Sequence, residues 1–200
     1  MESTVCFQQL LKDQCAVIVD EVMKGMTDKK HLIKVGVNKN LPPHKPILYR
    51  WWFPAKFAKS LVSAYQQEMH DNEDVLANVE KRKIKGMEYY ALYFGKSNNG
   101  WRRYNQHASK NVYSSTLRQT IYGLCIGNEY VEANELQVTK ILNTCYCEWI
   151  DFSNEGNLIE CIEGICIVLG NYPFNIEGNP SICDKWRKYI KNKRKIKNAR

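Results

Sequence analysis

The chain has 200 residues, a formal net charge of +8 and 44% hydrophobic residues. This length and apolar content suffice for one domain with its own core. The sequence contains no run of about eighteen apolar residues, so we expect no membrane span. Charged residues interrupt the first twenty or so positions, unlike a signal peptide, and we therefore expect a cytoplasmic protein.

The positive charge is concentrated near the C-terminal end of the sequence. Between Lys185 and Arg200 there are nine basic residues and no acidic one, so the rest of the chain is close to neutral. The aromatic residues Trp186 and Tyr189 lie among these cations, and such a mixture suits contact with a phosphate backbone. The alternative is a solvated final helix that ends in a basic tail.

The eight cysteines lie mainly within apolar stretches, which is typical of reduced core residues. The pair Cys145 and Cys147 has a single residue between its members, and no second pair has the spacing of a zinc site. We predict that none of the cysteines forms a disulfide bond.

Hydrophobic periodicity and turn residues predict the secondary structure in chain order. We expect strands over residues 31–37, 47–53, 87–94 and 144–152, with a loop at 38–45. We expect helices over residues 3–25, 100–109, 114–126, 132–143, 156–169 and 181–194. Most of residues 55–82 should also be helical, with a break near 71–74. This order is typical of an α+β fold in which helices flank a small antiparallel β-sheet.

The segment from Tyr93 to His107 is the most informative part of the sequence. An apolar strand stops at Gly95, and a polar turn leads into a helix rich in cations. Arg103 and His107 are four residues apart, which places them on one face of that helix. A phenol, a guanidinium and an imidazole brought together suit a phosphodiester substrate, because arginine binds phosphate and the other two groups can transfer protons.

This segment resembles the second half of the signature of the GIY-YIG nucleases. In that family a Tyr-Ile-Gly triplet ends a central strand, an arginine follows eight residues after the glycine, and a His or Tyr follows four residues later. Tyr93, Gly95, Arg103 and His107 match this spacing. The best match to the first tyrosine of the signature is Tyr49, although Ile47 stands where the family has glycine.

A second part of the family pattern lies further along the chain. The metal-binding glutamate of the family precedes, by about twelve residues, an asparagine in a Pro-x-Asn-like segment. Glu163 precedes Asn175 by twelve residues, and Pro173 lies two residues before that asparagine. Glu160, one helical turn before Glu163, is the alternative ligand.

The resemblance implies a domain over residues 46–180 with an insertion at 54–85, between an N-terminal extension at 1–45 and a basic C-terminal helix and tail at 181–200. It implies an endonuclease that uses Mg²⁺ or Mn²⁺ on Glu163 to cleave DNA, or RNA. The implied catalytic residues are Tyr49, Tyr93, Arg103, His107 and Glu163, and the implied substrate-binding residues are Gly95, Lys96, Arg102, Arg118 and Asn175.

Two other interpretations fit the same residues. The chain could be a nucleic-acid-binding module that keeps the fold without the chemistry. It could also be an unrelated α+β protein with Arg103 and Glu163 far apart on its surface. For Arg118, a surface arginine without function is an equal alternative to a phosphate contact.

Overall fold

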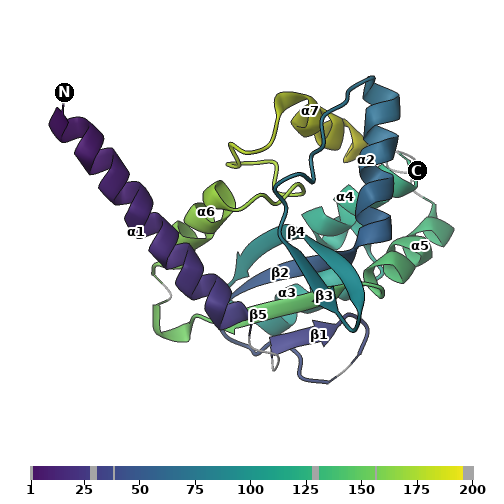
Figure 1. Ribbon diagram of the computed structural model, residues 1–200. Coiled ribbons are helices and arrows are strands. Elements are labelled where there is room, and N and C mark those ends of the chain that lie inside the picture. Colours follow the sequence, from purple (N-terminus) through teal and green to yellow (C-terminus); the bar gives the residue numbers. More distant parts are fainter. Residues whose placement is uncertain (1, 28–30, 38, 128–130, 156, 196–200) are drawn as a thin grey trace.

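The computed structural model describes residues 2–27, 31–37, 39–127, 131–155 and 157–195. Figure 1 shows the arrangement of its helices and strands. In chain order they are α1 (Glu2–Met26), β1 (Leu32–Lys34), β2 (Ile47–Pro54), α2 (Ala55–Met69), β3 (Lys81–Ile84), β4 (Met87–Ser97), α3 (Gly100–Ala108), the 3₁₀ turn η2 (Val112–Ser114), α4 (Thr116–Cys125), α5 (Glu132–Leu142), β5 (Tyr146–Asp151), the 3₁₀ turn η3 (Ser153–Glu155), α6 (Ile159–Leu169) and α7 (Asp184–Lys193).

The strands form one antiparallel sheet in the order β1-β5-β2-β4-β3, with helices on both faces (Figure 1). The central strand β2 pairs with β4 on one side and with β5 on the other. The expected α+β fold with a small antiparallel sheet is therefore confirmed. β2 and β4 lie side by side although an insertion separates them in the sequence, as the resemblance to the nuclease signature requires.

Side-chain alternation along β2 divides the core between the two faces of the sheet. Tyr49, Trp51 and Phe53 point into the larger cluster, which includes residues of α2, α4, α5 and α7. Leu48 and Trp52 point into the smaller cluster, beneath α1 and α6. Every one of these five side chains is almost completely buried, so β2 is the central strand of the core as well as of the sheet.

The segment after α2 differs from the prediction. We expected most of residues 55–82 to be helical, but α2 ends at Met69 and Lys81–Ile84 forms β3, which pairs with the start of β4. Three of the four residues of β3 are cations, a composition that does not favour a strand by itself. Pairing with β4 determines the conformation instead.

The two terminal helices have different relations to the core. α1 extends away from the body of the protein, and its C-terminal part packs against α6 and β5 (Figure 1). The expected C-terminal helix is present as α7, and it buries Trp186, Tyr189 and Ile190 in the larger cluster. These three side chains give α7 a structural role in addition to its positive charge.

The cysteines whose side chains the structure describes are all free, as predicted: Cys15, Cys125, Cys145, Cys147, Cys161, Cys166 and Cys183. Cys6 lies outside the side chains that the structure describes. Within the described ranges, no helix has both the length and the apolar character needed to cross a membrane.

Candidate active site

One end of the β2–β4 pair brings two of the predicted residues together. Tyr49 on β2 lies opposite Gly95 on β4. A Cβ atom at position 95 would lie 2.8 Å from the hydroxyl oxygen of Tyr49 and 2.9 Å from its Cζ, closer than non-bonded atoms tolerate. Gly95 is therefore needed to leave room for the Tyr49 ring, and its predicted contact with substrate stays a prediction.

The helix α3 carries Arg103 and His107 to the same place. Asn99 caps the helix by accepting a hydrogen bond from the backbone N–H of Arg102 at 2.9 Å, which fixes where α3 begins. One face of α3 then points toward β2, where Arg103 Nε donates to the Tyr49 hydroxyl at 3.0 Å and that hydroxyl lies 2.9 Å from His107 Nε2. The three side chains form a continuous hydrogen-bonded chain.

Tyr93 completes this cluster from the neighbouring strand. Its ring centroid lies 6.2 Å from that of Tyr49 and 5.7 Å from that of His107. The geometric part of the sequence prediction therefore agrees with the structure for these residues, with one difference. His107 is completely buried and Tyr49 is only 2% exposed, so Arg103 is the partly exposed member of this hydrogen-bonded chain.

Burial determines the protonation of this chain of residues. Burial, reinforced by the nearby Tyr93, raises the pKa of Tyr49 well above its usual value, although Arg103 acts in the opposite direction. Desolvation thus outweighs the adjacent guanidinium in setting the pKa of Tyr49. Burial, followed by the charges of Arg103 and Arg118, lowers the pKa of His107 well below its usual value. At neutral pH both side chains are uncharged.

The neutral His107 leads to a prediction about stability and pH. Below a pH of about 6.5 the unfolded chain binds a proton at this histidine and the folded protein does not. Burial of the neutral His107 therefore costs no stability above that pH. As pH falls below it, the free energy of unfolding decreases by up to about 1.4 kcal/mol per pH unit. Between pH 7.5 and 5.5, urea unfolding should show a smaller loss of stability for His107→Gln than for the wild type. The exposed His70 supplies the control His70→Asn, and equal losses in all three proteins would contradict the prediction.

The outer edge of β4 positions the glutamate. Beyond β3 this edge pairs with no other strand among the described residues, and the polypeptide around residue 174 covers it: Phe174 N donates to Leu92 O at 2.9 Å. The Asn175 side chain accepts from Phe94 N and donates to Phe94 O, both at 2.8 Å. Glu163 Oε1 continues the series by accepting from Lys96 N at 3.0 Å. Glu163 is thereby held next to the strand end that carries Gly95.

The carboxylate of Glu163 fits a weakly held divalent cation. Burial raises its pKa, while the Lys96 backbone N–H and, more weakly, Arg103 act in the opposite direction. Among the residues that the structure describes, no group of three or more His, Cys, Asp or Glu side chains converges on one point. Mg²⁺ commonly binds to one or two carboxylates and keeps several waters until substrate phosphates arrive, so a single glutamate suffices. The alternative ligand, Glu160, is exposed and forms an ion pair with Lys96 Nζ.

Two of the predicted substrate-binding residues have structural positions instead. The Arg118 guanidinium is completely buried and donates to the backbone oxygens of His107 at 3.2 Å and Lys110 at 3.2 Å. It holds the C-terminal end of α3, and its guanidinium has no exposed surface. The Asn175 side-chain amide forms hydrogen bonds with both the backbone N–H and the backbone oxygen of Phe94. Of the remaining candidates, Arg102 is exposed on α3 and Lys96 is partly exposed.

The structure also adds residues that the sequence analysis did not select. Gln106 Oε1 accepts from Arg103 Nη1 at 3.1 Å and so fixes the guanidinium from the same helix; its position three residues after Arg103 is the signal that could have revealed it. Trp101, 41% exposed, stacks on His44 with ring centroids 4.6 Å apart. No local pattern relates these two rings, because they come from different segments.

A family model of the GIY-YIG catalytic domain matches residues 47–196. The chain belongs to the GIY-YIG family. The match begins at the first residue of β2 and includes every candidate residue described above. Membership indicates a nuclease-type function and a nucleic-acid substrate, and GIY-YIG nucleases generally depend on a divalent metal. No curated protein and no solved structure matches the chain.

Proposed function

We propose that this GIY-YIG protein is a divalent-metal-dependent endonuclease that hydrolyses phosphodiester bonds of DNA. The observation that carries the proposal is the hydrogen-bonded chain from Arg103 through Tyr49 to His107, with Glu163 anchored on the adjacent strand edge. A cation, a proton-transfer pair and a carboxylate are the groups that phosphodiester hydrolysis needs.

Arg103 would bind the scissile phosphate. Its Nε is fixed by Tyr49 and its Nη1 by Gln106, so the guanidinium is already oriented before substrate binds. A preorganised cation stabilises charge that grows in the transition state without further reorganisation. Arg103 therefore contributes to catalysis beyond simple attraction of the substrate.

Tyr49 and His107 would accept the proton that the attacking water loses. A neutral tyrosine is a poor base, but its oxygen can accept a proton while its own proton moves to a hydrogen-bonded partner. His107 Nε2, 2.9 Å from the Tyr49 oxygen, is in position to receive it. Tyr93, whose side chain is largely buried beside both residues, would help to orient the Tyr49 phenol.

Glu163 would hold the metal ion. Bound Mg²⁺ or Mn²⁺ supplies positive charge that neutralises the phosphate and stabilises the departing oxygen. Glu163 contributes one carboxylate oxygen that is fixed by the Lys96 backbone and a second oxygen that is not engaged by that bond. The Lys96 ammonium remains paired with Glu160 beside it.

A plasmid-nicking assay tests this proposal. Supercoiled plasmid should be converted to nicked or linear DNA with Mg²⁺ or Mn²⁺, and conversion should stop when EDTA is present. Binding of the same plasmid should be measured in EDTA. Binding without cleavage under any metal condition, on plasmid and phage DNA alike, would show that the protein is a binding module of the same fold.

A further inference from the structure

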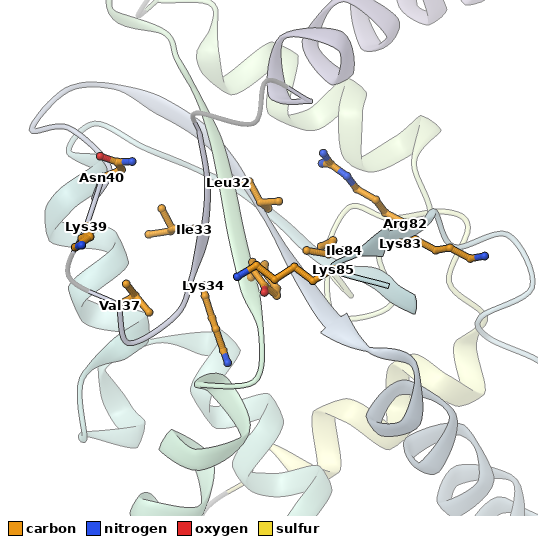
Figure 2. A pocket seen from close by; sticks show the side chains of 11 residues that line it. Leu32, Ile33, Lys34, Val37, Lys39, Asn40, Arg82, Lys83, Ile84 and Lys85 are labelled. Atoms are coloured by element: carbon orange, nitrogen blue, oxygen red, sulfur yellow. The ribbon is translucent and has the colours of Figure 1, made fainter. Parts of the chain in front are cut away.

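An open cleft of about 610 Å³ lies between the two edge strands of the sheet, β1 and β3. Its walls come from β1 and the following loop on one side and from the β3–β4 hairpin on the other (Figure 2). Ile33 and Ile84 contribute apolar surface to it, and the buried Tyr146 of β5 also lines it. The functional assignment above makes no use of this cleft.

The cleft is strongly basic. Lys34 and Lys39 lie on one wall and Lys83 and Lys85 on the other, and all four are exposed. Its described lining contains no acidic residue, and none of the four lysines forms an ion pair within the part of the chain that the structure covers. A fifth cation, Arg82, is already paired with Glu148, with 2.8 Å between Arg82 Nη1 and Glu148 Oε2. The Lys83 side chain extends away from the other three in Figure 2, and its neighbour across the hairpin is Glu88. Lys34, Lys39 and Lys85 therefore bring three uncompensated positive charges to one hollow.

One lysine of the cleft has a strained backbone conformation. Lys85 and Gly86 form the two-residue turn between β3 and β4, with φ values of 51° and 82°. Such a turn favours Asn, Asp or Gly at its first position, because other side chains are strained there. Asn40, which lines the opposite wall, also has a positive φ of 53°. A lysine kept at a strained turn tip suggests that its charge is used.

Lysines on edge strands also have a simpler role, since they prevent two sheets from pairing through their edges. That role explains Lys34 and Lys83 taken one at a time. It does not require lysines from two separate edges to face a common hollow, and it does not explain Lys85, which lies in the turn and not on a strand. Convergent cations without acidic partners are instead suited to an extended polyanion.

The hairpin wall of the cleft lies at the opposite end of β4 from the candidate active site, whereas the other wall approaches α3, where Gly36 N donates to the Tyr104 hydroxyl at 3.2 Å. Met87, which begins β4, pairs with Ile84, whereas Gly95 pairs with Tyr49. Eight residues of strand correspond to about 25 Å, which is the length of about seven nucleotides at 3.4 Å each. A nucleic acid held at both places would therefore have to extend several nucleotides from the scissile bond.

We propose that this cleft binds the sugar–phosphate backbone of the nucleic-acid substrate at a second place, about seven nucleotides from the phosphate that reacts. The proposal rests on the nuclease function proposed above and adds a substrate-length requirement to it. The lysines supply sequence-independent affinity, and release of counterions from the bound phosphates makes that affinity depend on salt.

The test compares two triple variants of equal charge. The cleft variant is Lys34→Gln, Lys39→Gln and Lys85→Asn, where asparagine suits the left-handed turn position. The control is Lys12→Gln, Lys56→Gln and Lys140→Gln, three exposed lysines on α1, α2 and α5. Binding to a 20-base-pair duplex and to a hairpin with a stem of about 5 base pairs is measured in EDTA over a range of salt concentrations, after circular dichroism has verified folding.

For the long duplex we expect the cleft variant to bind at least about tenfold more weakly than the control at 0.1 M salt. Its slope of log affinity against log salt should be lower by about two, because each lost phosphate contact removes about 0.9. For the short hairpin the two variants should differ by less than about threefold. Equal slopes for the two variants on the long duplex, or an equal loss on both substrates, would overturn the proposal.

Two further outcomes separate the cleft from the chemistry. If the wild type never cleaves DNA but the cleft variant still loses length-dependent binding, the cleft assignment stands and the nuclease proposal fails. If plasmid cleavage and DNA binding are unaffected in the cleft variant, the nuclease proposal stands and the cleft assignment fails. Poly-glutamate of matched charge serves as a competitor, and stronger binding of poly-glutamate than of DNA to the cleft would reassign it to acidic proteins.

Discussion

Replacing Glu163 with glutamine should reduce metal-dependent cleavage by at least about a hundredfold, the usual loss when one preorganised electrostatic group is removed from an active site. Glutamine keeps the size of the side chain and can still accept the hydrogen bond from Lys96 N. It removes the negative charge that would hold the metal. DNA affinity in EDTA should be equal or slightly higher, because an anion near the phosphates has been neutralised.

Glu160 provides a matched control for this experiment. It lies one turn before Glu163 on α6, its side chain is 78% exposed, and it pairs with the Lys96 ammonium. Glu160→Gln removes the same charge from the same helix and should keep cleavage within about threefold of the wild type. Cleavage rates at several Mg²⁺ concentrations should be measured for both variants. If Glu160→Gln loses cleavage and Glu163→Gln retains it, the metal ligand is Glu160 instead.

Replacing Glu148 with glutamine should lower the free energy of unfolding by about 3–5 kcal/mol, the cost of leaving a buried charge without its partner. Glu148 and Arg50 are both completely buried on the face of the sheet beneath α1 and α6. Arg50 Nε donates to Glu148 Oε1, Arg50 Nη1 to Glu80, and Arg82 Nη1 to Glu148 Oε2 at 2.8 Å. The Arg50 guanidinium also lies 4.6 Å above the Trp52 ring.

Chemical denaturation of four further variants completes this test: Glu88→Gln, Arg50→Met, Glu148→Leu and the double variant of the last two. The exposed pair of Lys59 and Glu88, with 3.8 Å between nitrogen and oxygen, supplies the control Glu88→Gln, which should change stability by less than about 1 kcal/mol. The double variant Arg50→Met with Glu148→Leu should be less destabilised than the sum of the two single variants, because it leaves no uncompensated charge between them. A loss below about 1 kcal/mol for Glu148→Gln would show that water or Glu80 compensates Arg50 fully.

The order of strands and helices could largely be predicted from the sequence, because most of these elements carry their own hydrophobic pattern. The run that contains Tyr93 is apolar throughout and became β4, and the segment of Arg103 became α3 within a residue of its expected end. β3 could not be predicted in this way. Its cationic residues gain nothing from a strand conformation until β4 supplies hydrogen-bond partners.

Part of the candidate site could be predicted from local spacing, and the other part depends on tertiary packing. The spacing of Gly95, Arg103 and His107 is local, and it determined that one turn and one helix would place these residues near each other. The pairing of Tyr49 with Gly95, across an insertion, and the capture of Glu163 by the edge of β4 depend on the sheet. The family resemblance placed Tyr49 and Glu163 in one predicted site with Arg103, whereas the backbone contacts that hold these two side chains depend on the sheet.

Burial was decided by the tertiary structure alone. The sequence gives no measure of how much water reaches a side chain, so Arg118 could equally be a surface residue or a phosphate contact, and in the structure it is completely buried. The same uncertainty applied to Tyr49, whose pKa is raised by desolvation although a cation lies beside it. Local sequence brought Gly95, Arg103 and His107 to the end of β4, and the sheet added Tyr49 and Glu163. Packing of the sheet against α3 and α6 then determined the charge states, because desolvation depends on atoms distant in the chain.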